Sequence, residues 1–88
     1  MLTMYLAMLG SETDRERFAL LYEAHERRVY AVALKILGNP VQAEDAAQQA
    51  WLQVLRNWDR VNGLEWEAAA KYLAVAAKNA ALDLLKKE

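Results

Sequence analysis

Apolar residues recur at steps of three and four along the first half of the chain, which is the spacing of one face of an α-helix. The stripe consists of Phe18, Leu21, Tyr22, His25, Val29, Val32, Ile36 and Leu37. Thr13 precedes the stripe and Glu16 follows Thr13 by three residues, which is the spacing of a capping box with Thr13 as N-cap. The pattern therefore predicts a helix over residues 14–37, about 36 Å long.

A second helix is predicted to follow after a short break. Gly38 suits a left-handed end of the first helix, Asn39 suits the N-cap of the next, and Pro40 fits its first turn. We expect this helix to span residues 40–58. The side chains that would face the core are Ala43, Ala47, Ala50, Trp51, Val54 and Trp58.

A third helix is predicted over residues 65–87, after a connection at residues 59–64. Asn62 and Gly63 indicate a turn within that connection. The inward stripe of the third helix would be Trp66, Ala69, Ala70, Leu73, Ala77, Ala80 and Leu84.

Composition supports one all-α domain over residues 1–88. Proline occurs once and glycine three times, and such scarcity of helix breakers favours long helices. Three amphipathic helices with short connections predict a compact bundle. Residues 1–12 would form an N-terminal arm, in which the apolar segment Met1–Leu9 predicts either a short helix or a packed extension.

Cysteine and long apolar runs are both missing from the sequence, and each absence excludes a class of structure. Without cysteine there is no disulfide framework and no thiolate metal site, which suits a reducing cytoplasm. No run of 18 apolar residues occurs, so we expect no membrane-spanning segment and no membrane partner.

The outward face of the second helix carries polar groups around one apolar residue. A rotation of about 100° per residue brings together Asp45, Gln48, Gln49, Leu52 and Arg56, with Glu44 at the edge. One interpretation is a solvated surface with a single exposed leucine, which is common. The other is a docking surface for a partner helix, whose arginines would form charge-assisted hydrogen bonds with it. These residues alone leave both interpretations open.

The outward face of the third helix is the one basic stretch of the chain. It combines Lys71, Val75, Lys78, Asn79, Leu82 and Lys86, and Tyr72 flanks it. Between residues 71 and 87, four lysines and one aspartate give a local charge of +3, whereas the whole chain carries −1. The helix dipole accounts for Lys86 and Lys87 but poorly for Lys71. Lysine, amide and aromatic groups together also suit contacts with phosphates and bases.

Catalytic chemistry finds little support in the sequence. His25 is the only histidine and lies on the apolar stripe, where a packed side chain is the simpler interpretation. Glu44 and Asp45 are adjacent, so they point in different directions on a helix and make a poor acid–base pair. A zinc site would need an unusual number of carboxylates, and no glycine-rich phosphate loop occurs. We therefore expect no enzyme, no metal and no cofactor.

Four segments match one known family in their order and spacing. They are Phe18–Tyr22, Val29–Gly38, Gln42–Trp51 and Ala77–Lys87. The third resembles an Ala-Glu-Asp-x-x-Gln-[Glu or Gln]-x-aromatic motif, and the fourth an Ala-Arg-Asn-x-x-x-Asp-x-x-basic-basic ending. Together, over about residues 17–87, the chain resembles region 2 of the extracytoplasmic-function branch of the sigma-70 family of RNA polymerase sigma factors.

The resemblance implies a part in bacterial transcription initiation, in the cytoplasm. In this family the second helix docks on the coiled coil of the β′ clamp of RNA polymerase. Carried onto this sequence, the docking contacts fall to Glu44, Asp45, Gln48, Gln49, Leu52 and Arg56. The polymerase core is then the expected partner, and an anti-sigma factor is left open as another.

The resemblance also implies capture of the −10 promoter element. In this family, the loop before the last helix and the outer face of that helix hold the single-stranded non-template strand, with a base turned out of the stack. That turn costs a few kcal/mol, which the pocket contacts must offset. Residues 59–64 would form the pocket wall, and the carried-over contacts are Asp59, Arg60, Asn62, Lys71, Tyr72, Lys78, Asn79, Lys86 and Lys87.

The chain departs from the family pattern on its third helix. Lysine stands where arginine is usual at several positions, which loses the planar fork for bidentate contacts. The family's helix-turn-helix region 4 is absent from residues 1–88, so we expect a fragment of a longer sigma factor, with a stand-alone protein or a mimic as alternatives. The alternative function is a helical protein-interaction module or regulator without DNA contact.

Overall fold

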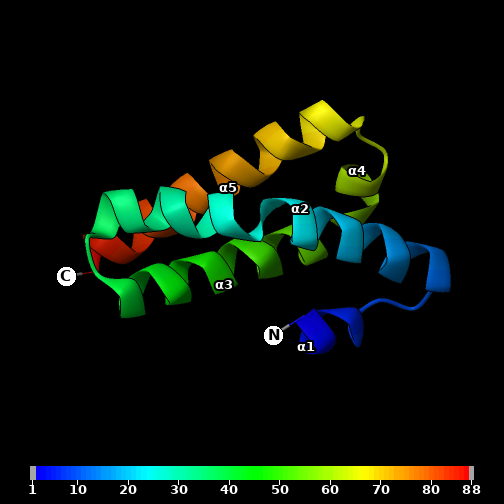
Figure 1. The fold of residues 1–88 in the computed structure, drawn as a ribbon, viewed down its shortest axis with the longest axis horizontal. Coiled ribbons are helices and arrows are strands. Elements are labelled where there is room, and N and C mark those ends of the chain that lie inside the picture. Colours follow the sequence, from blue (N-terminus) through cyan, green and yellow to red (C-terminus); the bar gives the residue numbers. More distant parts are fainter. Residues whose placement is uncertain (1, 88) are drawn as a thin grey trace.

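The computed structural model describes residues 2–87, and within that range it contains helices joined by turns and short loops, with no strand. They are α1 (Leu2–Leu6), α2 (Glu12–Leu37), α3 (Pro40–Arg56), α4 (Trp58–Asn62) and α5 (Trp66–Lys86). The long helices α2, α3 and α5 pack pairwise and run along the long axis of a molecule measuring 38 × 24 × 19 Å (Figure 1). The predicted all-α bundle is confirmed.

The start of α2 differs from the prediction by two residues. Ser11 has an extended backbone, and its hydroxyl accepts a hydrogen bond from the Asp14 amide at 3.1 Å, so Ser11 is the N-cap. The expected cap at Thr13 is wrong because α2 already begins at Glu12, so Thr13 lies inside its first turn. The other end is as expected, since Gly38 adopts a left-handed φ of 67° and its amide donates to the Leu34 carbonyl at 2.7 Å.

The start of α3 agrees with its sequence. The Asn39 side chain accepts a hydrogen bond from the Gln42 amide at 3.0 Å, and Pro40 occupies the first turn. The helix ends at Arg56, two residues short of the predicted end, because the chain turns at Asn57 into a separate helix.

The predicted connection at residues 59–64 is largely a helix instead. The Asn57 carbonyl accepts hydrogen bonds from the amides of Arg60 and Val61, at 3.1 and 3.0 Å, and so starts α4. This single turn buries Trp58 and Val61 in the core. Only the Gly63 turn remains of the expected loop, and the φ of Gly63, −83°, is one that any residue adopts.

The core has two clusters. The larger lies where α1, α2, α3, α4 and α5 meet, and its aromatic centre is Phe18, with ring centroids 5.9 Å from Tyr5, 5.6 Å from Trp51 and 5.6 Å from Trp58. The smaller cluster brings four alanines together near the α2–α3 turn: Ala33, Ala43, Ala46 and Ala81. The small side chains let the three long helices approach closely at that end.

The N-terminal arm is folded onto this core. The Tyr5 side chain is only 1% exposed and Leu9 is also buried, whereas Met4 and Met8 face outward. Trp66, by contrast, was expected to face inward and is 44% exposed. It sits at the first position of α5, beyond the end of the core, where Ala69 takes the buried position.

Candidate functional site

The outer surface of α3 is a polar ridge, here called the α3 ridge, made of Glu44, Asp45, Gln48, Gln49, Leu52 and Arg56. Glu44, Asp45, Gln49 and Arg56 are exposed, and Gln48 is half-buried. Leu52 was expected to stand out as an exposed apolar residue, but it is half-buried and packs against the larger core cluster. The ridge is therefore an accessible acid–amide surface with a partly covered apolar edge.

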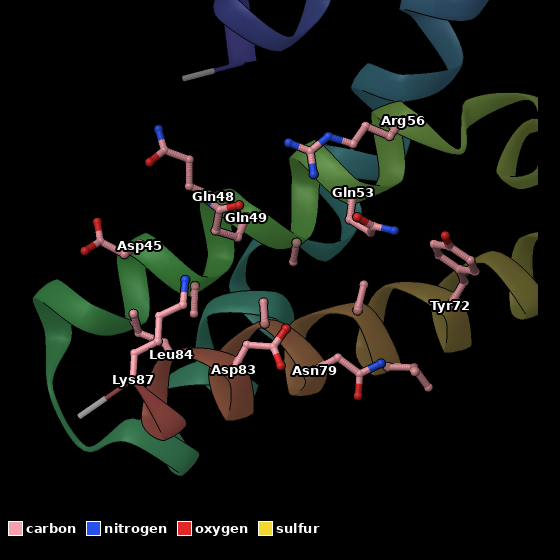
Figure 2. A pocket seen from close by; sticks show the side chains of 15 residues that line it. Asp45, Gln48, Gln49, Gln53, Arg56, Tyr72, Asn79, Asp83, Leu84 and Lys87 are labelled. Atoms are coloured by element: carbon pink, nitrogen blue, oxygen red, sulfur yellow. The ribbon is translucent and has the colours of Figure 1, made fainter.

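A groove runs along one side of the α3 ridge, between α3 and α5 (Figure 2). Its volume is about 690 Å³. Figure 2 shows Gln49 and Gln53 on the α3 wall, with Tyr72 and Asn79 opposite on α5. The charged groups that line it are Asp45, Arg56, Asp83 and Lys87.

A smaller pocket of about 260 Å³ lies on the other side of the ridge, between α1, α2 and α3. We call it the tyrosine pocket, and its lining is Tyr5, Tyr22, Glu26, Arg27, Tyr30, Glu44, Ala47, Gln48 and Trp51. Gln48 lines both hollows, so the ridge is the wall between them. The sequence indicated the ridge but not the hollows, because these depend on how α3 packs against its neighbours.

Six of the residues expected to contact DNA lie on α5 or directly after it, and they divide into two groups. Tyr72, Asn79 and Lys87 line the groove. Lys71, Lys78 and Lys86 are exposed but do not line it. The predicted basic face is thus continuous with the groove on one side and open to solvent on the other.

The connection between α4 and α5 is held against α2 by contacts that the sequence did not predict. Arg17 donates a hydrogen bond to the Leu64 carbonyl at 2.8 Å, and the Asn62 amide group donates to the Asp14 carboxylate at 3.3 Å. The His25 and Trp66 rings lie 5.7 Å apart. Asp59 and Arg60 remain exposed on α4. The segment that was expected to form the pocket wall, residues 59–64, is therefore tied to α2 by hydrogen bonds.

Two titratable groups of the core have pKa values shifted by burial. Burial, with a smaller effect of Arg28, lowers the pKa of His25, which keeps its imidazole neutral near pH 7. Burial also raises the pKa of Tyr5 to about 12. Within residues 2–87 no group of three or more acidic or histidine side chains is placed to hold a metal ion. In the same range no helix has the length and apolar character needed to cross a membrane.

Comparison with known proteins gives one consistent result. The family model described as Sigma-70 region 2 matches residues 21–88, which include most of α2 and all of α3, α4 and α5. The chain is similar to a curated protein, the ECF RNA polymerase sigma factor SigK of Mycolicibacterium vanbaalenii, at 31% identity over 81 residues. The similarity covers 89% of this chain but only 39% of that relative. No solved structure gives a significant match.

Proposed function

Because the chain belongs to the sigma-70 region 2 family, in its extracytoplasmic-function branch, we propose that it acts in bacterial transcription initiation. Its role is to dock on RNA polymerase and to engage the −10 promoter element. The observation that carries this proposal is the exposed α3 ridge, because the family motif falls on the same residues.

The docking contact is the α3 ridge against the coiled coil of the β′ clamp. Glu44 and Asp45 are exposed carboxylates on successive positions of α3, and Gln49 lies one turn beyond Asp45. Arginines on a partner helix would form charge-assisted hydrogen bonds with these groups. The uncovered part of Leu52 supplies an apolar edge to the contact.

The promoter contact is the surface from α4 along α5. Asp59, Arg60 and Asn62 would border the base that is turned out of the stack. Phosphates of the non-template strand would meet the exposed lysines of α5, and the groove offers a ring and amides for bases. The DNA-contacting residues are then Lys71, Tyr72, Lys78, Asn79, Lys86 and Lys87.

Reversal of one charge on the ridge tests the docking contact. We expect Asp45→Arg to weaken binding of the protein to the isolated β′ coiled coil at least about tenfold, because an attractive pair becomes a repulsive one. Titration calorimetry measures the affinity. The control is Glu23→Arg, the same kind of reversal on an exposed α2 residue outside the ridge and both hollows. Equal affinities of wild type and Asp45→Arg would contradict the docking assignment.

A regulator without DNA contact is the second candidate, and the net charge of −1 favours it. The acids Asp45 and Asp83 also line the groove beside the basic face of α5. This candidate predicts that the protein retains polymerase in a pull-down, while the assembled complex retains no promoter DNA.

A further inference from the structure

The tyrosine pocket has walls of aromatic rings. The Tyr22 ring centroid lies 5.9 Å from that of Tyr5 and 4.9 Å from that of Trp51, and the rings are tilted to one another. Tyr30 lies two turns further along α2 and also lines the pocket. Aromatic faces carry negative partial charge, so a pocket lined by them attracts cations.

Two carboxylates complete the pocket, one from α2 and one from α3. The Tyr22 hydroxyl donates a hydrogen bond to the Glu26 carboxylate on α2. Glu44 on α3 lies close enough to raise the pKa of both Tyr5 and Tyr22, after the larger effect of burial. Each carboxylate has about four lone-pair positions, so acceptor capacity remains for a ligand at both.

The size of the pocket favours a single side chain over a small molecule. Its volume of about 260 Å³ is below the range of roughly 300–1,000 Å³ that is typical of small-molecule sites. Glu44 and Gln48 belong both to this pocket and to the α3 ridge. A partner helix on the ridge would therefore lie directly beside the opening.

We propose that the tyrosine pocket receives an arginine side chain of the protein docked on the α3 ridge, with its guanidinium against the tyrosine rings and between Glu26 and Glu44. This inference rests on the proposed docking to the β′ coiled coil. Arginine fits better than lysine because its planar fork stacks on aromatic faces and binds carboxylates in bidentate fashion. Arg27 also lines the pocket, and its positive charge opposes an incoming cation.

Neutralisation of Glu26 tests the pocket without altering the ridge, because Glu26 lies on α2. We expect Glu26→Gln, which keeps an acceptor for the Tyr22 hydroxyl, to weaken coiled-coil binding about tenfold.

Changes at Tyr30 and Arg27 test the other walls of the pocket. Tyr30→Leu should weaken coiled-coil binding a few-fold because the ring is lost, whereas Tyr30→Phe, which keeps the ring, should bind like wild type. Arg27→Gln should strengthen binding. The controls are Glu23→Gln and Arg28→Gln, which change exposed α2 charges outside the pocket.

The partner arginine is identified by a double-mutant cycle. Each arginine of the coiled coil is changed to alanine in turn, and calorimetry compares the loss of affinity for wild type and for Glu26→Gln. One arginine should matter for wild type and lose most of its effect in the variant. Thermal unfolding of each variant checks that the fold is kept.

The two proposals fail in different ways. If wild type binds the coiled coil and Asp45→Arg does not, yet Glu26→Gln and Tyr30→Leu bind like wild type, the docking stands and the arginine pocket is wrong. The same conclusion follows if no arginine shows coupling to Glu26. If wild type does not bind the coiled coil at all, the docking assignment itself is wrong and the pocket inference is overturned with it.

Discussion

His25 is the clearest case of a residue whose role changes between sequence and structure. In the sequence it is a lone histidine on an apolar stripe. In the fold it is 8% exposed and packs beside Trp66, and its Nε2 has no hydrogen-bond partner within the described residues. The charged imidazolium donates from both ring nitrogens and so needs two acceptors. Because Nε2 of His25 has none among the described residues, burial favours the neutral form.

This burial makes stability depend on pH in one window. Burial and Arg28 lower the folded pKa of His25 below its ordinary value of 6.5, so the unfolded chain takes up the proton first as the pH falls. The free energy of unfolding should therefore decline from about pH 6.5 down to the folded pKa, by at most about 1.4 kcal/mol per pH unit. Above that window His25 contributes no pH dependence.

We expect His25→Gln to remove this decline. Urea unfolding at about pH 7.5 and about pH 5.5 measures the free energy of unfolding of both proteins. The wild type should lose more stability between these values than the variant does. Parallel losses in the two proteins would mean that His25 is not the group that titrates.

At the scale of elements, α4 shows what a short helix contributes. It has five residues and no side-chain cap, so it is too short to be stable alone. Its position is fixed by Trp58 and Val61, which are buried in the larger core cluster. Asp59 and Arg60, which we propose border the promoter strand, lie on its exposed side.

Truncation of Val61 tests whether α4 is part of the core. Val61 is fully buried, so Val61→Ala should lower the free energy of unfolding by about 1–3 kcal/mol through lost burial and a residual cavity. The same truncation at Val41, which is 72% exposed on α3, should change stability by less than about 0.5 kcal/mol. If both truncations lower the free energy of unfolding by a similarly small amount, residues 59–64 would be the loop that the sequence predicts and not part of the core.

The elements that were predicted correctly are those governed by local rules. The stripe of α2 and the Gly38-Asn39-Pro40 turn depend on residues at most about four positions apart, so their geometry follows from spacing and caps. The hydrogen bond from Arg17 to Leu64 joins residues 47 positions apart, and no local pattern indicates it. The exposure of Trp66 and the tyrosine pocket likewise depend on the way the helices pack together. The candidate site was thus predicted as a list of residues but not as two hollows beside a ridge.

For the whole molecule, the distribution of charge matters more than its sum. The net charge of −1 gives no general attraction to nucleic acid. The lysines of α5 form a local basic surface, whereas Glu44 and Asp45 are exposed acids on α3. An acidic docking surface and a basic face on neighbouring helices would keep the polymerase and the DNA strand apart on one small domain.

This arrangement predicts weak, salt-sensitive binding of single-stranded DNA that depends on which lysines are present. We expect Lys78→Glu combined with Lys86→Glu to abolish measurable binding to a −10-like oligonucleotide. Neutralising both lysines instead, as Lys78→Gln with Lys86→Gln, should lower the slope of log affinity against log salt by about 1.4, because each phosphate contact releases about 0.7 counterion on single strands. Fluorescence anisotropy over a range of salt concentrations gives both quantities.

The matched control for that experiment is Arg27→Glu with Lys35→Glu, which makes the same change in total charge on exposed α2 residues. If the DNA strand follows α5, the control should lose only the small part of affinity that comes from net charge. If the control and the α5 variant lose affinity equally, binding reflects net charge alone and α5 is not the promoter face. If neither loses affinity, the strand contacts another surface, and the assignment of α5 as the promoter face is wrong.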